Sequence, residues 1–290
     1  MNTVFLDYDQ AALDAAYDQI NWAPNRDQLL ARYATMSDAA RGVLGQPSRL
    51  SYGEGKAESC DLYRASVTPA PVRIFIHGGA WRAGSARDAA YPAEMFVAAG
   101  AHFIAVEFDH IQDVAGDLRV LAGQVRRAVA WICRNAASFG GDPEGVYLAG
   151  HSSGAHLAAV ALTTDWSVFG LPRDCIKGGL LISGMYDLHP VRLSARARYV
   201  AFDDEVERDF SPIRHLAHLS APLVVAYGSL ESPEFQRQAQ AFAAAVAQTA
   251  KPCRLVEAPG YNHFELVETV ANPFGVLGRE ALAQMGLSLR

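Results

Sequence analysis

The chain has 290 residues, half of them hydrophobic, and its 25 Lys and Arg against 31 Asp and Glu give a formal net charge of −6. This length and composition suit one α/β domain with a substantial core. The acidic residues are scattered, which argues against nucleic acid or an anionic membrane surface as partner. The N-terminus lacks the pattern of a signal peptide, and no apolar run is long enough for a membrane helix, so we expect a cytoplasmic protein.

The sequence also bears on metal and redox chemistry. No two of the four cysteines have the spacing of a metal knuckle or a redox pair, so we expect free and mostly buried thiols in a reducing compartment. They are Cys60, Cys133, Cys175 and Cys253. The chain contains no HExxH pattern and no clustered His and Asp ligands, which predicts no metal and no other cofactor.

Residues 1–48 are predicted to form an N-terminal helical extension. The segments 9–20 and 25–45 are rich in Ala, Leu, Gln and Arg, and the second ends at Gly45. Two short strands are expected next. They lie around residues 50–52 and 60–64, on either side of a Gly-rich turn.

From residue 71 onward, strands and helices alternate. Short apolar runs predict strands at 72–76, 102–108, 145–150, 178–184, 222–228 and 253–260. Apolar residues at helical spacing predict helices at 89–100, 113–140, 153–162, 233–250 and roughly 276–286. Each return between parallel strands needs a crossover, so this order predicts an α/β fold with a mostly parallel central sheet and helices on both faces.

We expect a single domain over residues 1–290, because no repeat or low-complexity linker interrupts the pattern. Residues 186–220 are polar and irregular and interrupt the alternation. Together with the N-terminal helices they are predicted to form a cap over a site. Whether those helices act as a lid or as a homodimer contact stays open.

The first candidate for chemistry is Gly150-His151-Ser152-Ser153-Gly154, a G-x-S-x-G sequence. A strand is predicted before it and a helix after it, which is the setting of a nucleophile elbow. Such a sharp turn holds the serine in a strained backbone conformation and exposes its Oγ at the carboxyl end of the sheet. Ser152 is therefore the predicted nucleophile.

A serine hydroxyl needs a base, and in this architecture the histidine comes last in the chain. His263 lies in the segment PGYNHFELVE, which we expect to be a loop after the final strand. The other histidines flank the serine, belong to the glycine motif, begin a strand or precede the acid. They are His77, His102, His110, His151, His156, His189, His215 and His218.

The acid that orients this histidine should follow the preceding strand. Glu231 lies in the predicted loop after that strand and is our choice. Glu234 opens the next helix, where a carboxylate also stabilises the helix dipole. Asp187, after the previous strand, is the rival, and its alternative role is to cap or anchor the 186–220 segment.

The sequence His77-Gly78-Gly79-Ala80-Trp81 follows an earlier strand and suits an oxyanion hole. Glycines let backbone N–H groups approach a developing negative oxygen without a Cβ in the way. The predicted donors are the N–H groups of Gly78, Gly79 and Ser153, while His77 anchors the loop. Trp81 is predicted to form a pocket wall suited to an aromatic substrate, with core packing as the equal alternative.

Five motifs in this order resemble the kynurenine formamidases, or arylformamidases. They are HGGAW, GHSSGAHL, SGMYDL, SPEFQRQ and GYNHFELV, and the resemblance covers roughly residues 50–270. These enzymes are α/β hydrolases related to the hormone-sensitive-lipase-like esterases. HGG-x-W is the more telling motif, because the wider esterase group usually has a third glycine where Ala80 stands.

The resemblance implies an α/β-hydrolase fold and the metal-free cleavage of N-formylkynurenine to kynurenine and formate. Carried over by position, it implies a triad of Ser152, Glu231 and His263. The family usually has Asp where Glu231 stands, a departure that leaves hydrolysis intact and puts the close identity of the substrate in doubt. Trp81, Tyr186 and residues 186–220 would shape the aromatic pocket.

The function expected from this reasoning is hydrolysis of a small N-acylated aromatic amine through an acyl-enzyme. The alternative is a carboxylesterase for short-chain or aromatic esters, which would use the same site. A hydrolase fold that serves only as a binding module is disfavoured, because such a protein would be expected to lose a triad member or the oxyanion glycines. The expected partner is thus a small aromatic amide or ester.

Overall fold

The computed structural model of the chain describes residues 3–289 and has one eight-stranded sheet at its centre. The strands are β1 (Ser48–Ser51), β2 (Ser59–Tyr63), β3 (Ala70–Ile76), β4 (His102–Val106), β5 (Gly141–His151), β6 (Gly178–Ile182), β7 (Leu223–Gly228) and β8 (Cys253–Ala258). Their order across the sheet is β1-β2-β4-β3-β5-β6-β7-β8. Only the β1–β2 and β2–β4 pairs are antiparallel, which confirms the mostly parallel sheet.

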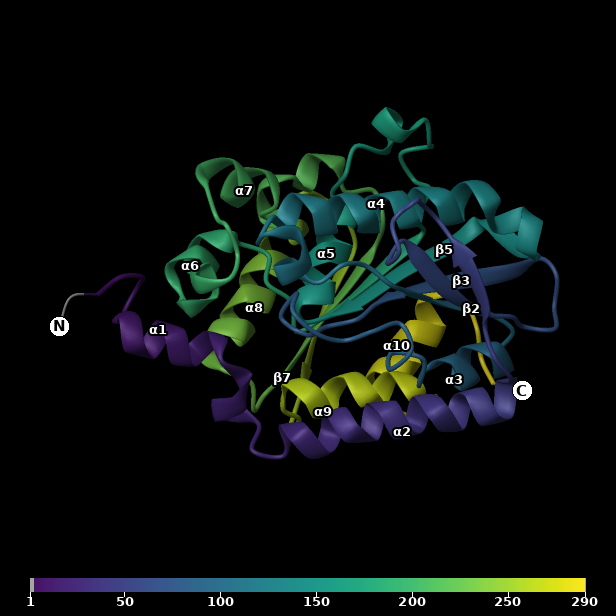
Figure 1. Cartoon of the computed structure of the whole chain (residues 1–290), viewed down its shortest axis with the longest axis horizontal. Helices are drawn as coiled ribbons and strands as arrows, with labels where there is room; N and C mark the ends of the chain where they lie inside the picture. The colour runs from purple at the N-terminus through teal and green to yellow at the C-terminus, as the bar shows by residue number, and fades with distance from the viewer. Residues whose placement is uncertain (1–2, 290) are drawn as a thin grey trace.

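Helices cover both faces of the sheet. They are α1 (Gln10–Tyr17), α2 (Arg26–Leu44), α3 (Ala93–Ala98), α4 (Leu118–Asn135), α5 (Ser153–Leu162), α6 (Leu188–Leu193), α7 (Asp204–Asp209), α8 (Pro233–Ala247), α9 (His263–Glu268) and α10 (Val276–Gln284). Helices α4, α5 and α8 contribute to the core on one face, and α2, α3, α9 and α10 to the core on the other (Figure 1). This is the three-layer arrangement of an α/β-hydrolase fold.

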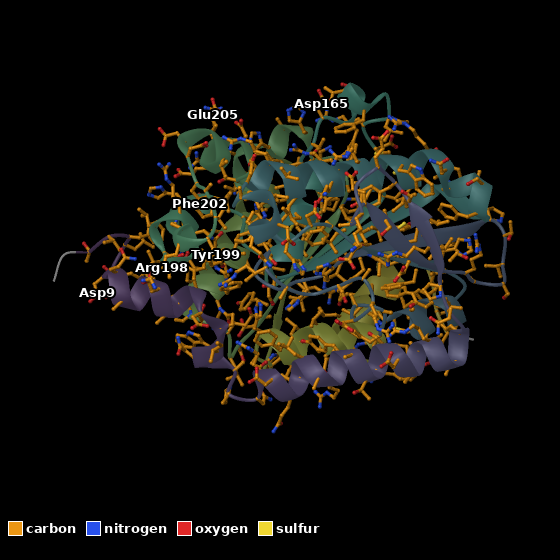
Figure 2. All side chains as sticks on the ribbon, in the orientation of Figure 1. Asp9, Asp165, Arg198, Tyr199, Phe202 and Glu205 are labelled. Atoms are coloured by element: carbon orange, nitrogen blue, oxygen red, sulfur yellow. The ribbon has the colours of Figure 1, made fainter. Side chains whose placement is uncertain are left out.

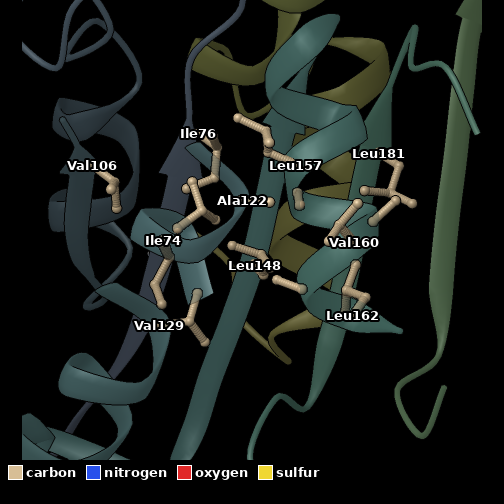
Figure 3. Close-up of a cluster of buried hydrophobic side chains, with 14 of the residues drawn as sticks. Ile74, Ile76, Val106, Ala122, Val129, Leu148, Leu157, Val160, Leu162 and Leu181 are labelled. Carbon is tan, nitrogen blue, oxygen red and sulfur yellow. The ribbon is translucent and has the colours of Figure 1, made fainter. Parts of the chain in front are cut away.

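The larger core lies between the sheet and helices α4 and α5. Val129 of α4 and Leu157 of α5 meet Ile74 of β3 and Leu148 of β5 there, and all four are fully buried or nearly so (Figure 3). Because the strands are covered on both faces, their side chains are apolar nearly throughout. This core fixes the carboxyl ends of β3, β5 and β7, from which the candidate site residues project.

The segment 186–220 differs from the irregular stretch that we expected. It forms α6, α7 and three short 3₁₀ turns: η5 (Ala195–Arg198), η6 (Pro212–Arg214) and η7 (Leu216–His218). Asp187, Ser194 and Asp203 each accept a backbone N–H at the start of one of these turns. Side-chain capping of this kind stabilises turns that are too short to show apolar periodicity, so the pattern in the sequence missed them.

The N-terminal segment packs against this insertion. The side chain of Gln238, in α8, donates to the Tyr17 hydroxyl and to the carbonyl of Asp187, and accepts from the backbone N–H groups of Tyr186 and Asp187. One buried amide therefore fastens α1 and the start of α6 to the body of the molecule. Within residues 3–289, no helix has the length and apolar character needed to cross a membrane.

Candidate active site

Ser152 stands on a sharp turn between β5 and α5. Its backbone angles are φ 56° and ψ −123°, a combination that residues with a Cβ rarely adopt. The flanking glycines explain how the turn closes. A Cβ at Gly154 would collide with the carbonyl oxygens of Ile76 and His77, and one at Gly150 would collide with the carbonyl of Gly154. The turn therefore has the strained strand–turn–helix geometry expected for a nucleophile elbow.

The glycine motif after β3 lies directly beside this turn. Strand β3 is parallel to β5 with Ile76 opposite Gly150, so the two loops leave the sheet together. A Cβ at Gly78 would lie 3.1 Å from the Cβ of Ser152, and the N–H of Trp81 donates to Ser153 Oγ over 3.1 Å. This close approach accounts for the glycine at position 78, because a larger residue would push the loop away from the serine.

The loop that carries the glycines is itself held in place. Gly79 has φ 124°, and its carbonyl accepts from the N–H groups of Arg82 and Ala83. The His77 ring stacks on Phe108 at 4.4 Å, and its Nδ1 lies 2.9 Å from the carbonyl oxygen of Gly78. Its Nε2 lies 3.5 Å from Glu107. In the described chain, neither Gly78 nor Gly79 donates its N–H to another backbone group, so both N–H groups are free to face a ligand.

His263 and Glu231 form a buried pair. The Nδ1 of His263 lies 2.9 Å from Oε2 of Glu231, and both side chains are almost fully buried. The two residues meet because β7 and β8 are parallel neighbours whose ends, Gly228 and Ala258, face each other in the register. The pair leaves Nε2 of the imidazole free for a proton-transfer partner.

Two further donors hold the carboxylate. Ser183 donates its hydroxyl to Oε1 of Glu231 over 2.5 Å, and the Gly228 N–H donates to the same oxygen over 2.7 Å. A buried carboxylate is stable only when its lone pairs are satisfied, and these three contacts satisfy both oxygens. Nothing in the sequence around Ser183 pointed to this contact, since it joins the ends of two different strands.

The other two carboxylates that we considered have different partners. Asp187 caps α6 through the N–H of His189 and lies 3.8 Å from Arg214. Glu234 is fully buried in α8 and bonds Arg237 and the Tyr17 hydroxyl. Glu231 is thus the carboxylate that the structure brings to His263.

The expected loop position of His263 is wrong, because it is the first residue of helix α9. Asn262 accepts the N–H groups of Phe264 and Glu265, and the Glu265 side chain accepts the Asn262 N–H. This reciprocal capping box starts the helix immediately after the β8 turn. The pattern N-x-x-E was visible in the sequence and would have predicted the helix start.

His151, next to the serine, also contacts the histidine. Its Nε2 lies 2.9 Å from the carbonyl of His263, and the two rings are 4.7 Å apart. Burial lowers the pKa of His151 well below its ordinary value, and the nearby His263 charge lowers it further. His151 is therefore neutral at pH 7 and ties the elbow to the backbone of α9 without adding charge.

Ser152 and His263 line the same cavity of about 810 Å³, together with Gly78 and Gly79. Aromatic side chains from four parts of the chain form much of the wall. They are Tyr17, Tyr33, Phe75, Tyr91, Tyr199 and Phe264. The wall is completed by both predicted parts of the cap, since Gln19 and Leu30 of the N-terminal segment and Arg196 of η5 also line the cavity.

The prediction that Trp81 and Tyr186 line the substrate pocket is wrong. Trp81 is only 1% exposed, packs edge-on against His156 at 5.3 Å and does not line the cavity. Tyr186 is fully buried and stacks on Phe242 at 4.3 Å. Both are therefore core residues. The chain turns Trp81 inward behind the oxyanion loop, and Tyr186 packs on α8 through Phe242. The aromatic wall comes instead from residues whose position depends on how the N-terminal segment folds back.

The four cysteines are free, as expected, and Cys60, Cys133 and Cys175 are buried. Although Cys133 and Cys175 are far apart in the sequence, Cys133 Sγ lies 3.8 Å from the Cys175 carbonyl. They lie on the α4 side of the sheet, and neither lines the cavity.

Comparison with known proteins gives consistent results. A family model described as BD-FAE matches residues 60–170. The chain is 32% identical to the kynurenine formamidase of Salmo salar over 260 residues, which cover 87% of this chain and 86% of that protein. It is 31% identical to esterase LipC of Mycobacterium tuberculosis over 247 residues, which cover 76% of this chain and 60% of that protein.

Solved structures agree on the fold. A crystal structure from Silicibacter sp. superposes with a TM-score of 0.80 at 27% identity, covering 91% of this chain and 97% of that chain. Esterase LipW of Mycobacterium marinum superposes with a TM-score of 0.73 at 18% identity, covering 94% of this chain and 95% of that chain, a likeness that shows the fold alone. From this fold and the relatives' sequences, we conclude that the chain is a hydrolase of the amide or ester type and belongs to the kynurenine formamidase family of α/β hydrolases.

Proposed function

We propose that this enzyme hydrolyses the amide bond of a small N-acylated aromatic amine of the N-formylkynurenine type, through an acyl-enzyme on Ser152. The observation that carries the proposal is the buried His263–Glu231 pair, whose histidine lines the same aromatic-walled cavity as Ser152. Flat aromatic walls suit an arylamine leaving group. The kynurenine formamidases of Salmo salar and Danio rerio also match this chain over 87% and 95% of its length.

In the proposed mechanism, Ser152 Oγ attacks the formyl carbon while Nε2 of His263 accepts the hydroxyl proton. The N–H groups of Gly78, Gly79 and Ser153 stabilise the negative oxygen of the tetrahedral intermediate. His263 then donates its proton to the amine nitrogen, the C–N bond breaks and the arylamine leaves.

Water attacks the remaining formyl ester, and His263 accepts a proton from it and returns one to Ser152 as formate departs. Glu231 holds the imidazole in the tautomer with hydrogen on Nδ1 and stabilises the imidazolium that forms twice in each cycle. Its three hydrogen-bond donors keep it in place during both steps.

A second candidate is a carboxylesterase that acts on short-chain or aromatic esters with the same residues. It is favoured by the similarity to esterase LipC. An ester is easier to cleave than an anilide, because the leaving alcohol needs less protonation. Proton donation from His263 to the leaving group is therefore more important for the formamidase than for the esterase.

The test compares kcat/KM for N-formylkynurenine and p-nitrophenyl acetate in the wild type and in Ser152→Ala. The proposal expects formamide turnover of about 10⁴ M⁻¹s⁻¹ or above, a value typical of enzymes on their own substrates. Turnover of the ester alone would favour the second candidate. Full activity of Ser152→Ala on both substrates would overturn the nucleophile assignment. A matched Ser167→Ala variant controls for the substitution itself, because Ser167 is an exposed residue of η4 (Trp166–Phe169) that does not line the cavity.

A further inference from the structure

Arg196 is a buried cation in the wall of the catalytic cavity. It lies in η5, is 6% exposed and lines the cavity. Its Nη1 donates to the Tyr199 hydroxyl over 2.9 Å and its Nη2 donates to the Tyr17 carbonyl over 3.0 Å. These bonds use two of the five N–H groups of a guanidinium, and the buried Nε has no hydrogen-bond partner among residues 3–289.

No carboxylate in the described chain pairs with Arg196. Seven charged side chains line the cavity: Asp14, Asp18, Arg26, Arg82, Asp88, Arg196 and Arg198. Asp14 pairs with Arg198 at 3.3 Å, and Arg26 pairs with Asp27 outside the wall. Asp18 caps η1 (Gln19–Trp22), and Asp88 accepts from the Ser85 hydroxyl. Within residues 3–289, this leaves the charges of Arg82 and Arg196 without an acidic partner.

Arg82 and Arg196 meet at the same tyrosine. The guanidinium of Arg82 lies over the Tyr199 ring at 4.5 Å, while Arg196 bonds the hydroxyl of that ring. Arg82 is exposed and follows the oxyanion loop directly in the chain. Figure 2 shows Arg198 and Tyr199 on the cap, and Arg198 pairs with Asp14 of the N-terminal helix. The two cations therefore lie at the cap side of the cavity, with Arg196 inside and Arg82 at the surface.

A buried guanidinium without a counter-ion is costly, because it loses hydration and gains no anion in return. A ligand carboxylate would restore the balance, since its two oxygens match the planar donors of arginine. A singly charged carboxylate also loses less hydration than a phosphate dianion on entering an aromatic-walled cavity. We propose that Arg196, assisted by Arg82, binds a carboxylate on the substrate, which makes the enzyme selective for anionic aromatic amides or esters. This inference rests on the proposed function and specifies the class of its substrate.

The test uses ester hydrolysis as a reporter, so that it does not depend on formamide turnover. p-Nitrophenyl acetate is hydrolysed in the presence of 4-oxo-4-phenylbutanoate or of its uncharged carboxamide, two inhibitors of equal shape. The wild type should bind the carboxylate at least about tenfold more tightly than the amide, in line with a charge-assisted hydrogen bond. Arg196→Gln should bring the two inhibition constants together, and Arg196→Lys should keep part of the difference.

Arg208→Gln is the matched control. Arg208 is exposed and lies in the same insertion, and among residues 3–289 it forms an ion pair only with its neighbour Asp209. Its loss therefore changes the net charge equally without touching the cavity. The Arg208→Gln variant should prefer the carboxylate inhibitor over the carboxamide by the same factor as the wild type. Because Arg82 is exposed, Arg82→Gln should fold normally and lower the preference by about threefold, which keeps the test valid if Arg196→Gln is unstable.

Equal inhibition of the wild type by acid and amide would overturn the proposal. So would a loss of affinity in Arg196→Gln that is the same for both inhibitors, because Arg196 would then only pin the cap to Tyr17. A carboxylate preference in an enzyme that leaves N-formylkynurenine intact would support the anion site and refute the formamidase assignment. Thermal shifts of the wild type with each inhibitor give the same comparison should the ester not be hydrolysed.

Discussion

Ser183 donates its hydroxyl to Oε1 of Glu231 over 2.5 Å, while His263 occupies the other oxygen of the same carboxylate. The hydroxyl therefore fixes the carboxylate from the side that the imidazole leaves free. We predict that Ser183→Ala lowers kcat by about tenfold and leaves KM nearly unchanged, because a hydrogen bond to a charged group contributes on the order of 1.5–3 kcal/mol. Steady-state kinetics on p-nitrophenyl acetate measure the two constants, and an unchanged kcat would contradict a role for Ser183 in positioning Glu231.

The assignment of Glu231 predicts a large loss for an uncharged replacement of the same shape. Glu231→Gln should lower kcat by about 10³- to 10⁴-fold, since an amide favours the wrong imidazole tautomer and cannot stabilise the imidazolium. The matched variant Asp187→Asn should keep near-wild-type activity, because Asn caps a helix as well as Asp does. If Asp187→Asn were the inactive variant instead, the acid would be misassigned.

Glycine at position 78 is predicted to be essential for activity rather than for folding. A Cβ there would lie 2.9 Å from His151 Nδ1 and 3.1 Å from Ser152 Cβ, so Gly78→Ala should displace the oxyanion loop by a few tenths of an ångström. Displaced donors of this kind cost about 10²-fold in kcat. Comparing kcat with the melting temperature separates the two effects, and a variant that is unstable yet fully active in its folded fraction would contradict the prediction.

Gly42→Ala is the control for that substitution. Gly42 lies inside α2 with open space around it, so alanine should stabilise the protein by about 0.5–1 kcal/mol and leave kcat unchanged.

Buried neutral histidines predict that the protein loses stability in mild acid. Burial lowers the pKa of His156 to about 4, and it also lowers the pKa values of His151 and His102. Between pH 6.5 and 4, the unfolded chain binds a proton at His156 that the folded chain does not, so the free energy of unfolding falls as pH falls. For His156 alone the loss at pH 4 is on the order of 3 kcal/mol.

Urea unfolding of wild type and His156→Gln across this pH range measures the effect. The glutamine amide can still donate to the Phe210 carbonyl, which lies 2.8 Å from Nε2 of His156, but it does not titrate. The variant should therefore show a shallower pH dependence, while His218→Gln, at an exposed position, should follow the wild type. Parallel curves for wild type and His156→Gln would contradict the prediction.

The sequence predicted those parts of the molecule that depend on local pattern. Strand–helix alternation predicted the sheet and its main helices, and the helix expected at 153–162 is α5 (Ser153–Leu162). Position in the chain brought Ser152, Glu231 and His263 under consideration, because parallel strands release their loops at one edge of the sheet. These inferences need only the order of the elements.

Contacts between distant segments could not be read in this way. The wall residue Tyr17 is 217 positions away from Glu234, which its hydroxyl contacts, and Arg196 reaches the carbonyl of that same tyrosine. Trp81 was misplaced for a related reason. Whether an aromatic residue after the oxyanion loop faces ligand or core depends on what lies behind the loop, and here His156 lies behind it.

The fastening of the cap by Gln238 has a consequence for chimaeras made between relatives. Gln238 bonds both Tyr17 and Asp187, and Arg196 of the insertion also donates to the Tyr17 carbonyl, so the first 45 residues and the 186–220 segment should be exchanged together. A swap of one alone would leave buried donors and acceptors unmatched, at a cost of about 1–3 kcal/mol for each group. A paired swap would leave Ser152, Glu231 and His263 unchanged, because none of them lies in either exchanged segment. The two segments together could therefore transfer the substrate range of one relative to another, while the recipient keeps its own catalytic residues.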